Sequence, residues 1–336
     1  MIHEKSAQSD DMQTPGPIRV VLTRHDEESE HVVDAVVSTV EQVQLAYGDR
    51  QRNVIARSSL KPIQVLPLVS TGAADAFGVS DKELALAAAS HSGEQAHLDA
   101  VGAWLKRIGL DESALECGAA RPLSIDAADG VLRDGGSFER IHNCCSGKHA
   151  GFLTIAQHLG VDPSGYVERG HRVQQLVVEA IETFTGQTLA DRPNGIDGCG
   201  IPTFALPLEA LAHSMATLAH PIGLDTQNQD AAGRVTTALA ANPYWISGTD
   251  RREVQLHAAA TEPLVIKTGA EGVFMVALPK RGVGIALKAR DGAVRAAELA
   301  VALVLEELDV IAAGHAVAPV TNAAGTVVGT MQAHSS

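Results

Sequence analysis

The sequence predicts a mixed α+β fold, in which an antiparallel sheet of N-terminal and C-terminal strands packs against helices, with a helical middle part between them. Two observations lead to this prediction. Apolar and polar residues alternate near both ends of the chain, as in half-buried strands, whereas the segment between them has helical spacing. Strands at both ends of a helical middle are expected to form one antiparallel sheet that the terminal segments complete.

The expected strands are short and end at turn residues. They lie at residues 18–24, 31–40, 42–48, 263–269, 273–279 and 282–289. Two capping boxes, at Ser80–Glu83 and Ser92–Gln95, are expected to start the first long helices, because each precedes an apolar periodic run. Further helices are expected over residues 147–160, 165–186, 206–219, 226–241 and about 291–314.

The chain is expected to form a single domain over residues 18–330, in which a helical middle at about 60–245 is inserted between the sheet-forming ends. Its length of 336 residues suits one large domain or two modest ones. Residues 1–17 are polar and are expected to form a mobile tail, and residues 331–336 a short C-terminal tail.

Charge and composition disfavour several classes of partner. Asp and Glu number 40 against 26 Lys and Arg, which gives a net charge of −14. Such a surface repels nucleic-acid phosphates and anionic lipids, so neither a nucleic acid nor a membrane is an expected partner. The N-terminus lacks the apolar stretch of a signal peptide, and four cysteines are too few for a disulfide scaffold. The sequence therefore predicts a cytoplasmic enzyme that acts on a small molecule.

The first candidate motif is R-S-S-L-K-P at residues 57–62, which contains S-x-x-K. If a helix begins there, Ser58 caps it and Lys61 lies one turn later on the same face. A neutral Lys61 amine could then take the proton of the Ser58 hydroxyl, and the helix start could donate N–H groups to an oxyanion. In the alternative interpretation, Ser58 only caps a helix and Lys61 is solvated, because S-x-x-K alone is a weak pattern.

The second candidate motif is K-T-G, which begins with Lys267 at the end of an apolar strand. S-x-x-K followed by K-T-G is the order found in penicillin-recognising serine enzymes and serine-dependent glutaminases. Lys267 could instead be a charge that protects an edge strand. No S-D-N lies between the two motifs, which weakens a β-lactam hydrolase or peptidase assignment.

Two further motifs carry polar or metal-binding side chains. S-H-S-G-E at residues 90–94 lies at a break between helices, where Ser90 is free for chemistry because Ser92 is explained as a cap. Cys145 and Cys199 lie 54 residues apart in glycine-containing segments and could meet at a zinc ion. Buried structural cysteines are the alternative, since lysine binds metals only as a neutral amine and Cys-x-x-Lys is no standard zinc pattern.

Taken together, R-S-S-L-K-P, A-S-H-S-G-E, C-S-G-K-H-A-G, D-G-C-G-I-P and K-T-G-A-E-G, in this order, resemble the rhizobial-type (class 3) L-asparaginase family. The resemblance extends from about Arg24 to Gly329. It implies a fold similar to serine β-lactamases and glutaminases, a homodimer, and hydrolysis of L-asparagine to L-aspartate and ammonia. One stretch departs from the family pattern, because Glu28–Val33 lacks the His-Arg-Gly that usually follows Glu-Ser.

The resemblance also implies the roles of individual residues. It implies two Ser–Lys catalytic pairs, Ser58 with Lys61 and Ser90 with Lys267, in which Ser58 is the nucleophile. The implied zinc ligands, which leave Cys117 and Cys144 outside the metal shell, are Cys145, Lys148 and Cys199. The implied polar residues of the same pocket are Arg57, His149 and Asp197, the last of which is the candidate partner of the substrate ammonium group.

The expected mechanism is an acyl-enzyme route in which Lys61 is the base for Ser58 and Ser90 relays a proton to the leaving ammonia. Three alternatives stay open. A glutaminase, or a serine hydrolase of another small amide, would keep both Ser–Lys pairs. A zinc hydrolase, in which the metal supplies the nucleophile, would make Ser58 dispensable. A non-catalytic amino-acid sensor is disfavoured, because binding alone does not require paired lysines.

Overall fold

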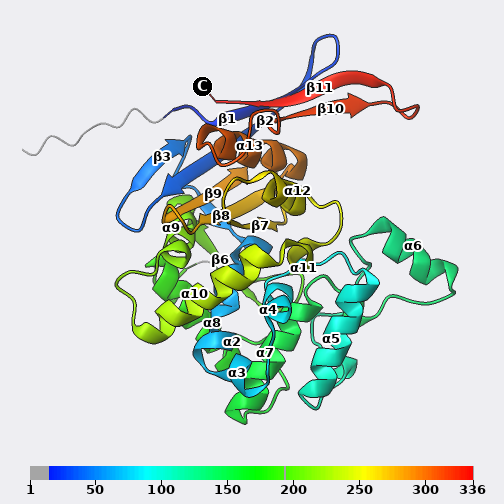
Figure 1. Cartoon of the computed structure of the whole chain (residues 1–336), viewed down its shortest axis with the longest axis vertical. Coiled ribbons are helices and arrows are strands. Elements are labelled where there is room, and N and C mark those ends of the chain that lie inside the picture. The colour runs from blue at the N-terminus through cyan, green and yellow to red at the C-terminus, as the bar shows by residue number, and fades with distance from the viewer. Residues whose placement is uncertain (1–14, 193, 336) are drawn as a thin grey trace, which may run out of the picture.

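The sheet-forming ends of the chain lie above the helical part in Figure 1, a computed structural model that describes residues 15–192 and 194–335. Most of the expected N-terminal tail, residues 1–14, lies outside the described residues. Within the described part, no helix has both the length and the apolar composition needed to cross a bilayer.

The main sheet has eight strands, in the order β10-β11-β1-β2-β9-β8-β7, with β3 also paired to β2. All its pairs are antiparallel, which confirms the predicted sheet of terminal segments. The N-terminal strands are β1 (Ile18–Thr23), β2 (Glu27–Ser38) and β3 (Val43–Tyr47). The C-terminal strands are β7 (Val265–Gly269), β8 (Val273–Leu278), β9 (Val283–Ala289), β10 (Val317–Thr321) and β11 (Val327–His334).

The C-terminal end differs from the expectation. Residues 331–334, expected to be tail, form the end of β11, which pairs with both β1 and β10. The expected helix over 291–314 is shorter, because α13 spans Val294–Glu307. Of the two missed strands, β10 contains Pro319, which is unfavourable inside a strand, and the apolar residues of β11 are interrupted by glycine and polar residues. The sequence does contain a turn residue between these strands, Asn322. In the structure its side chain accepts hydrogen bonds from two backbone N–H groups of the hairpin loop.

Helices cover both faces of the main sheet. α13 contacts β1, β2, β8, β9 and β11 on one face, and α9 (Leu208–Ala219) contacts β2, β8 and β9 on the other. The buried residues accordingly form two hydrophobic clusters. Alternation along β2 assigns Val37 to the cluster with α13 and Val36 to the cluster shared with the helical part.

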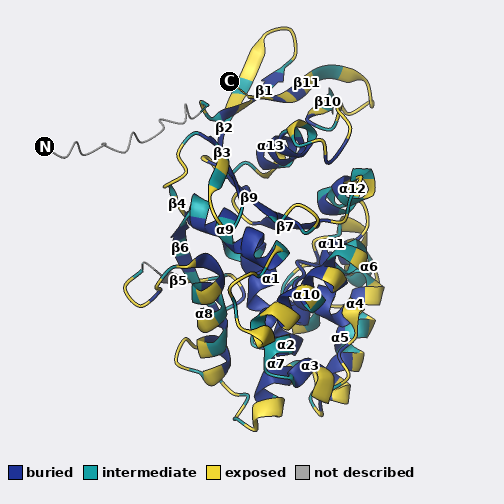
Figure 2. Cartoon of the chain, turned by 60° about the vertical axis from the view of Figure 1, so that its left-hand side comes forward, coloured by how far each residue is buried: buried dark blue, intermediate teal, exposed yellow. Residues whose placement is uncertain are grey.

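The helical part surrounds α7 (Ser146–Leu159), which has 11 buried residues and is dark blue in Figure 2. Its other elements before α7 are the 3₁₀ helix η1 (Arg57–Leu60), α1 (Lys61–Gln64), α2 (Leu66–Ser70), α3 (Ala73–Ala76), α4 (Asp81–Ala87), α5 (Gln95–Arg107), η2 (Glu112–Ala114), α6 (Ile125–Arg133) and η3 (Arg140–His142). After α7 come α8 (Arg172–Thr185), α9, α10 (Thr226–Ala241), α11 (Pro243–Ser247) and α12 (Arg252–Ala259). A small sheet of β4 (Asn53–Ile55), β6 (Pro202–Pro207) and β5 (Asn194–Ile196) adjoins them.

One of the two expected capping boxes forms. The Ser80 side chain accepts a hydrogen bond from Glu83 N and the Glu83 carboxylate accepts one from Ser80 N, so α4 begins as predicted. The box expected at Ser92–Gln95 is wrong, because the N-cap of α5 is Glu94 and the Ser92 hydroxyl donates to Ser247 O at 2.6 Å instead.

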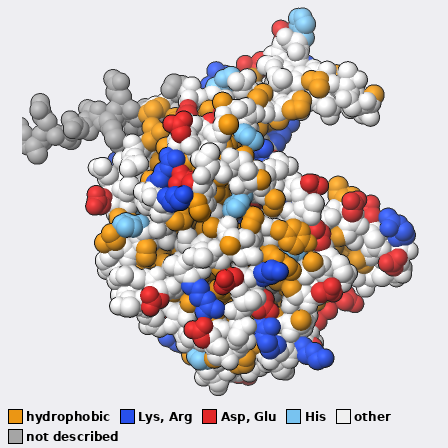
Figure 3. All heavy atoms as spheres, viewed as in Figure 1, with side chains coloured by type: hydrophobic (Ala, Val, Ile, Leu, Met, Phe, Trp, Pro, Cys, Tyr) orange, Lys and Arg blue, Asp and Glu red, His pale blue; other side chains and the backbone are white. Residues whose placement is uncertain are grey.

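The surface mixes charges of both signs. On the face shown in Figure 3, Lys and Arg side chains are interspersed with Asp and Glu among apolar and neutral groups. The whole sequence has 40 acidic and 26 basic residues, so its net charge is negative.

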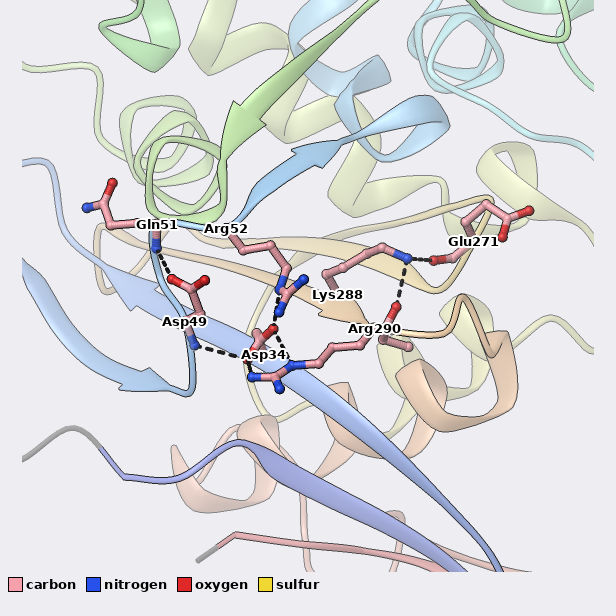
Figure 4. Close-up of polar contacts among 8 residues, drawn as sticks. Asp34, Asp49, Gln51, Arg52, Glu271, Lys288 and Arg290 are labelled. Atoms are coloured by element: carbon pink, nitrogen blue, oxygen red, sulfur yellow. Dashed lines mark hydrogen bonds and ion pairs between the residues drawn. The ribbon is translucent and has the colours of Figure 1, made fainter. Parts of the chain in front are cut away.

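A buried carboxylate ties the main sheet to the segment that leads to η1. Asp34 of β2 is fully buried and accepts hydrogen bonds from Arg290 Nη2 at 2.7 Å, Arg52 Nε at 2.7 Å and Asp49 N at 3.0 Å (Figure 4). Arg290 directly follows β9 and Arg52 directly precedes β4. The Asp34 carboxylate thus connects β2, β9 and the start of β4, which leads into η1 a few residues later.

Candidate active site

The S-x-x-K and K-T-G segments lie directly against each other. η1 contacts β7, and Gly269 at the end of β7 is pressed onto its start. A Cβ atom at Gly269 would lie 2.6 Å from Ala56 O and 3.0 Å from Ser59 N, so no other residue fits without movement. The glycine of K-T-G therefore permits the close approach that brings Lys267 near Lys61.

Arg57 adopts an unusual backbone conformation directly before Ser58. Its φ of 53° lies in the left-handed region, which costs a non-glycine residue about 1 kcal/mol or more. Its side chain is anchored, since Arg57 Nε donates to Asp197 Oδ1 at 2.5 Å and Gly198 N donates to the same oxygen at 2.8 Å. The sequence-predicted residues Arg57 and Asp197 are thus brought together as an ion pair.

The two serines of S-S-L-K differ in exposure. Ser58 is partly exposed, and its hydroxyl has no hydrogen bond to any described residue. Ser59 is fully buried and donates to Ala56 O at 2.7 Å. Ser58 does not cap the helix as expected, because the N-cap of η1 is Ala56 and no side chain caps it. Ser58 therefore presents a free hydroxyl at the edge of the site.

Lys61 is fully buried and turns toward Ser90. Its Nζ donates to Ser90 Oγ at 3.0 Å, to Cys145 Sγ at 3.1 Å and to Ala89 O. Its backbone N–H donates to Ser58 O, but no side-chain hydrogen bond joins Lys61 Nζ to Ser58 Oγ among the described residues. The interpretation of Lys61 as a solvated side chain is therefore wrong.

Ser90 lies between two buried amines. Lys267 Nζ donates to Ser90 Oγ at 3.1 Å and to Thr268 O at 2.7 Å, opposite the contact from Lys61. Ser90 is 6% exposed, and both lysines are completely buried. The structure thus places Lys61, Ser90 and Lys267 in one hydrogen-bonded chain.

The two amines affect each other electrostatically. Burial, followed by the nearby charge of Lys61, lowers the pKa of Lys267 to about 7. Lys267 therefore changes protonation state near neutral pH. Above pH 7 it is mainly a neutral amine that can accept a proton from Ser90.

A second polar cluster joins Lys148 to the cysteines. Lys148 Nζ donates to Cys199 Sγ at 3.0 Å, and the Cys145 and Cys199 thiols are hydrogen-bonded to each other. Cys117 lies apart and its thiol donates to Arg140 O. Because Lys61 also contacts Cys145, the cluster is continuous with the Ser–Lys chain.

The donor set of this cluster fits zinc. Two sulfur atoms and one amine converge in a buried region, and soft sulfur and nitrogen donors suit that metal. No group of three His, Cys, Asp or Glu residues able to hold a metal occurs among the described residues, so a three-residue site needs the lysine amine. Burial opposes the charged form of Lys148, but the sulfur atoms of Cys199 and Cys145 raise its pKa overall, so a metal has to displace a proton.

His149 is buried beside the cluster rather than exposed. Its Nδ1 is hydrogen-bonded to Tyr166 Oη at 2.6 Å, and its Nε2 has no partner among the described residues. Burial and then the charge of Lys148 lower the pKa of His149 well below its usual value, so the imidazole is neutral.

The sequence did not indicate what holds Ser90 in place. Ser90 N donates to Ile246 O at 2.9 Å, and Ser92 Oγ donates to Ser247 O nearby. Gly248 has a φ of 114°, and a Cβ atom there would lie 2.3 Å from Ser92 Oγ. The S-H-S-G-E motif could have signalled this contact, but its second serine fits a helix cap equally well.

The comparisons with known proteins agree with one family. The family model described as L-asparaginase II matches residues 20–333. The comparison with curated proteins gives no match for the chain.

Several solved structures are distantly similar. Native Mglu is 16% identical over 84% of this chain and 65% of its own, with a TM-score of 0.47. A beta-lactamase from Mycobacterium bovis is 14% identical over 83% of this chain and 95% of its own, with a TM-score of 0.42. A probable glutaminase from Bacillus subtilis, complexed with 6-diazo-5-oxo-L-norleucine, is 12% identical over 83% and 85%, with a TM-score of 0.37. The chain thus spans just under two thirds of the Mglu chain.

Proposed function

The chain belongs to the L-asparaginase II family, and on that premise we propose that it hydrolyses L-asparagine to L-aspartate and ammonia through an acyl-enzyme. The observation that carries the proposal is the buried chain of Lys61, Ser90 and Lys267, together with the partly exposed Ser58 on η1, which contacts β7. A serine nucleophile needs a base, and this chain offers a neutral amine at neutral pH.

Exposure distinguishes the roles of the two serines. Ser58 is partly exposed and can meet a substrate, whereas Ser90 is enclosed between the amines. We therefore assign Ser58 as the nucleophile that attacks the side-chain amide carbon and Ser90 as the group that passes protons. As the Lys61 ammonium receives the Ser58 proton it passes one of its own to Ser90, and Ser90 passes its hydroxyl proton to Lys267, the neutral amine whose pKa is lowered.

The remaining steps balance within the same groups. The new C–O bond to Ser58 gives a tetrahedral intermediate, whose C–N bond breaks as a proton returns from the lysine chain to the leaving nitrogen. Ammonia departs and an ester remains. Water then attacks the ester carbon, gives its proton to the same chain, and releases L-aspartate and the Ser58 hydroxyl.

Arg57 and Asp197 suit the two charged ends of the substrate. The Asp197 carboxylate is opposite in sign to an α-ammonium group, and the Arg57 guanidinium can form paired hydrogen bonds with an α-carboxylate. Their mutual ion pair at 2.5 Å holds both side chains at the edge of the site before substrate arrives. His149 is a neutral neighbour of this region.

We also propose that Cys145, Lys148 and Cys199 hold one zinc ion per subunit. When bound, zinc would supply a fixed positive charge that orients the polar groups around it. Within the chain, these residues join the start of α7 to the turn that carries Asp197.

One experiment tests the proposal against its alternatives. Ammonia release is measured on asparagine and glutamine, and ring opening is measured on a small β-lactam panel, with wild type and Ser58→Ala. Turnover of asparagine that Ser58→Ala abolishes supports the proposal, and preferred turnover of glutamine makes the protein a glutaminase. Full activity in a folded Ser58→Ala variant would favour the second candidate, a zinc hydrolase built on the cysteine–lysine cluster.

We also propose that the protein is a homodimer, as the resemblance implies, and that it is cytoplasmic, as the sequence predicts. Light scattering coupled to size-exclusion chromatography measures the subunit number directly, and fractionation of the source cells measures the location.

A further inference from the structure

Glu253 is a buried carboxylate without an adequate partner. It lies in the first turn of α12 and is 2% exposed. Its Oε1 has no hydrogen-bond partner among the described residues. Its Oε2 lies 3.8 Å from Nε of Arg251, whose side chain is one-third exposed. A buried charge is costly unless a close cation balances it, so this long and partly solvated contact is insufficient.

Lys267 has the complementary deficiency. An ammonium group carries three N–H donors, and Lys267 uses two of them, on Ser90 Oγ and Thr268 O. β7, which carries Lys267, is the last strand of the main sheet, and α12 packs against it (Figure 1). Lys267 on β7 therefore has one N–H donor without a partner, and Glu253 on the neighbouring α12 has one carboxylate oxygen without a partner, among the described residues.

Electrostatics point the same way. Burial lowers the pKa of Lys267 most, followed by the charge of Lys61; Glu253 then opposes them, Arg251 lowers the pKa further, and Cys144 raises it. These are the charged and titratable groups that face Lys267. Glu253 is the largest of the effects that favour its ammonium form.

We infer that Glu253 is a positioning residue, whose carboxylate balances the Lys267 ammonium and keeps its amine directed at Ser90. The role of Glu253 in catalysis rests on the proposed function, whereas the electrostatic effect of Glu253 on Lys267 does not. Each time Lys267 receives a proton, the carboxylate stabilises the charged state that results. Without it, the buried amine is a weaker base and is free to turn from Ser90.

The direct test reads the titration of Lys267 without turnover. The chain has only eight lysines, so labelling lysine with ¹³C at Cε gives a small set of NMR signals, and Lys267→Arg identifies the signal of Lys267. Glu253→Gln should lower the midpoint of this signal by about one pH unit, because it removes a nearby opposite charge. Glu253→Asp should shift the Lys267 midpoint less, because the negative charge is kept on a shorter side chain that lies farther from the amine.

Glu298→Gln is the matched control. Glu298 is a partly buried carboxylate near Glu253 and Arg252, but it is not among the groups that shift Lys267. The control should leave the Lys267 midpoint unchanged. An equal shift in Glu298→Gln, or an unshifted midpoint in folded Glu253→Gln, would overturn the inference. If Glu253→Gln does not fold, Glu253→Asp carries the test, and an unchanged midpoint there has the same consequence.

A kinetic readout separates this inference from the proposed function. In Glu253→Gln the acid limb of the kcat/KM profile should move to lower pH together with the NMR midpoint, and kcat on the plateau should fall severalfold with KM little changed. A wild type inactive on every amide would overturn the proposed function but not the electrostatic pairing. An NMR shift without any change in the pH profile of an active enzyme would overturn the positioning role.

Discussion

Ser58 and Ser90 are identical side chains that differ in exposure, and this difference underlies the roles that we propose for them. Ser58 follows a residue in left-handed conformation, which directs the chain so that its hydroxyl stays at the edge of the site. Ser90 is fixed by Ile246 O through its backbone and by two amines through its side chain. A hydroxyl held by two buried amines suits proton transfer, and a free hydroxyl suits attack on a substrate.

Replacing Ser58 by Ala should reduce kcat/KM for asparagine by about 10⁴-fold, because the acyl-enzyme can no longer form. The fold should persist, since this hydroxyl has no partner among the described residues. Ser113→Ala, an exposed serine on η2, is the matched control and should retain activity. Ammonia release with purified, folded variants measures both, and a Ser58→Ala value near that of wild type would remove the acyl-enzyme route.

Activity should rise through pH 7 and then level off. Lys267 accepts protons only as a neutral amine, and its pKa is lowered to about 7 by burial and Lys61. A group with this pKa is about one-tenth neutral at pH 6, so kcat/KM there should be about tenfold below the plateau. A profile that falls between pH 6 and pH 8, while circular dichroism shows a folded protein, would contradict Lys267 as the acceptor.

The sequence allowed these residues to be chosen but not paired. The i, i+3 spacing predicts that Ser58 and Lys61 share a helix face, yet spacing does not decide where a long side chain ends. The Lys61 amine is drawn to acceptors at Ala89, Ser90 and Cys145, which lie far along the chain. Such partners depend on tertiary packing, so the Lys61–Ser90 contact could not be predicted from local pattern.

At the level of elements, β11 is a strand with few consecutive apolar residues that nevertheless forms part of the main sheet. Met331 and Ala333 of β11 are buried, although Gln332 between them is exposed. From the sequence alone, the second half of the strand is therefore predicted to be a tail. Its pairing with β1 shows that it belongs to the main sheet. β7, β8 and β9, by contrast, are buried at every position except Lys288 and could be predicted from their apolar runs.

Deleting residues 331–336 should lower the free energy of unfolding by at least about 2 kcal/mol, because it removes the buried Met331 side chain and exposes the edge of β1. Deleting only residues 335–336 keeps β11 and is the control. Urea denaturation compares the two. Equal stability of both deletions would mean that residues 331–334 form a tail after all.

Asp34 should be a main stabilising contact between β2, β9 and the start of β4. Burial raises its pKa, but hydrogen bonds from Arg290, Asp49 N and Arg52 outweigh burial and lower it overall. Asp34→Asn should cost about 2 kcal/mol, a value discounted because both guanidinium groups are partly exposed. Exposed Asp134→Asn is the control and should cost nothing measurable.

The stabilisation that Asp34 provides should change with pH in a definite direction. Because the pKa is lower in the folded state, the stabilisation is present above the unfolded pKa of about 3.9 and is lost as pH falls through the folded value. The stability difference between wild type and Asp34→Asn should therefore shrink in acid. A difference that grows below pH 4 would contradict the ion-pair account.

At the scale of the whole molecule, the fold brings together motifs that the chain keeps far apart. The sheet is made from both ends of the chain, and Lys267 of β7 reaches the Ser90 hydroxyl that Lys61, which follows β4, also contacts. The general architecture followed from strand patterns at both ends. The contacts between motifs did not, because they depend on how η1, α7 and β7 pack, as the close approach at Gly269 illustrates.

Metal binding should link these distant segments and therefore stabilise the entire fold. Cys145 and Lys148 belong to the start of α7, whereas Cys199 lies in the turn after β5, so one ion would join two parts of the molecule. Zinc at 100 times its Kd should add about 2.7 kcal/mol to the free energy of unfolding, and a chelator should remove this gain. Differential scanning calorimetry with and without chelator measures the change in Tm.

The metal affinity should also depend on pH, since Lys148 and Cys199 must lose protons when the metal binds. The sulfur neighbours raise the pKa of Lys148, and the hydrogen bond with Cys145, together with burial, raises the pKa of Cys199. Lowering the pH therefore favours protons over zinc at both groups. Elemental analysis should find one zinc per subunit in wild type and in the control Cys117→Ser, but little in Cys199→Ser. A zinc-free wild type prepared without chelator, or a Cys199→Ser variant that keeps its full zinc content, would show that these residues do not form a metal site.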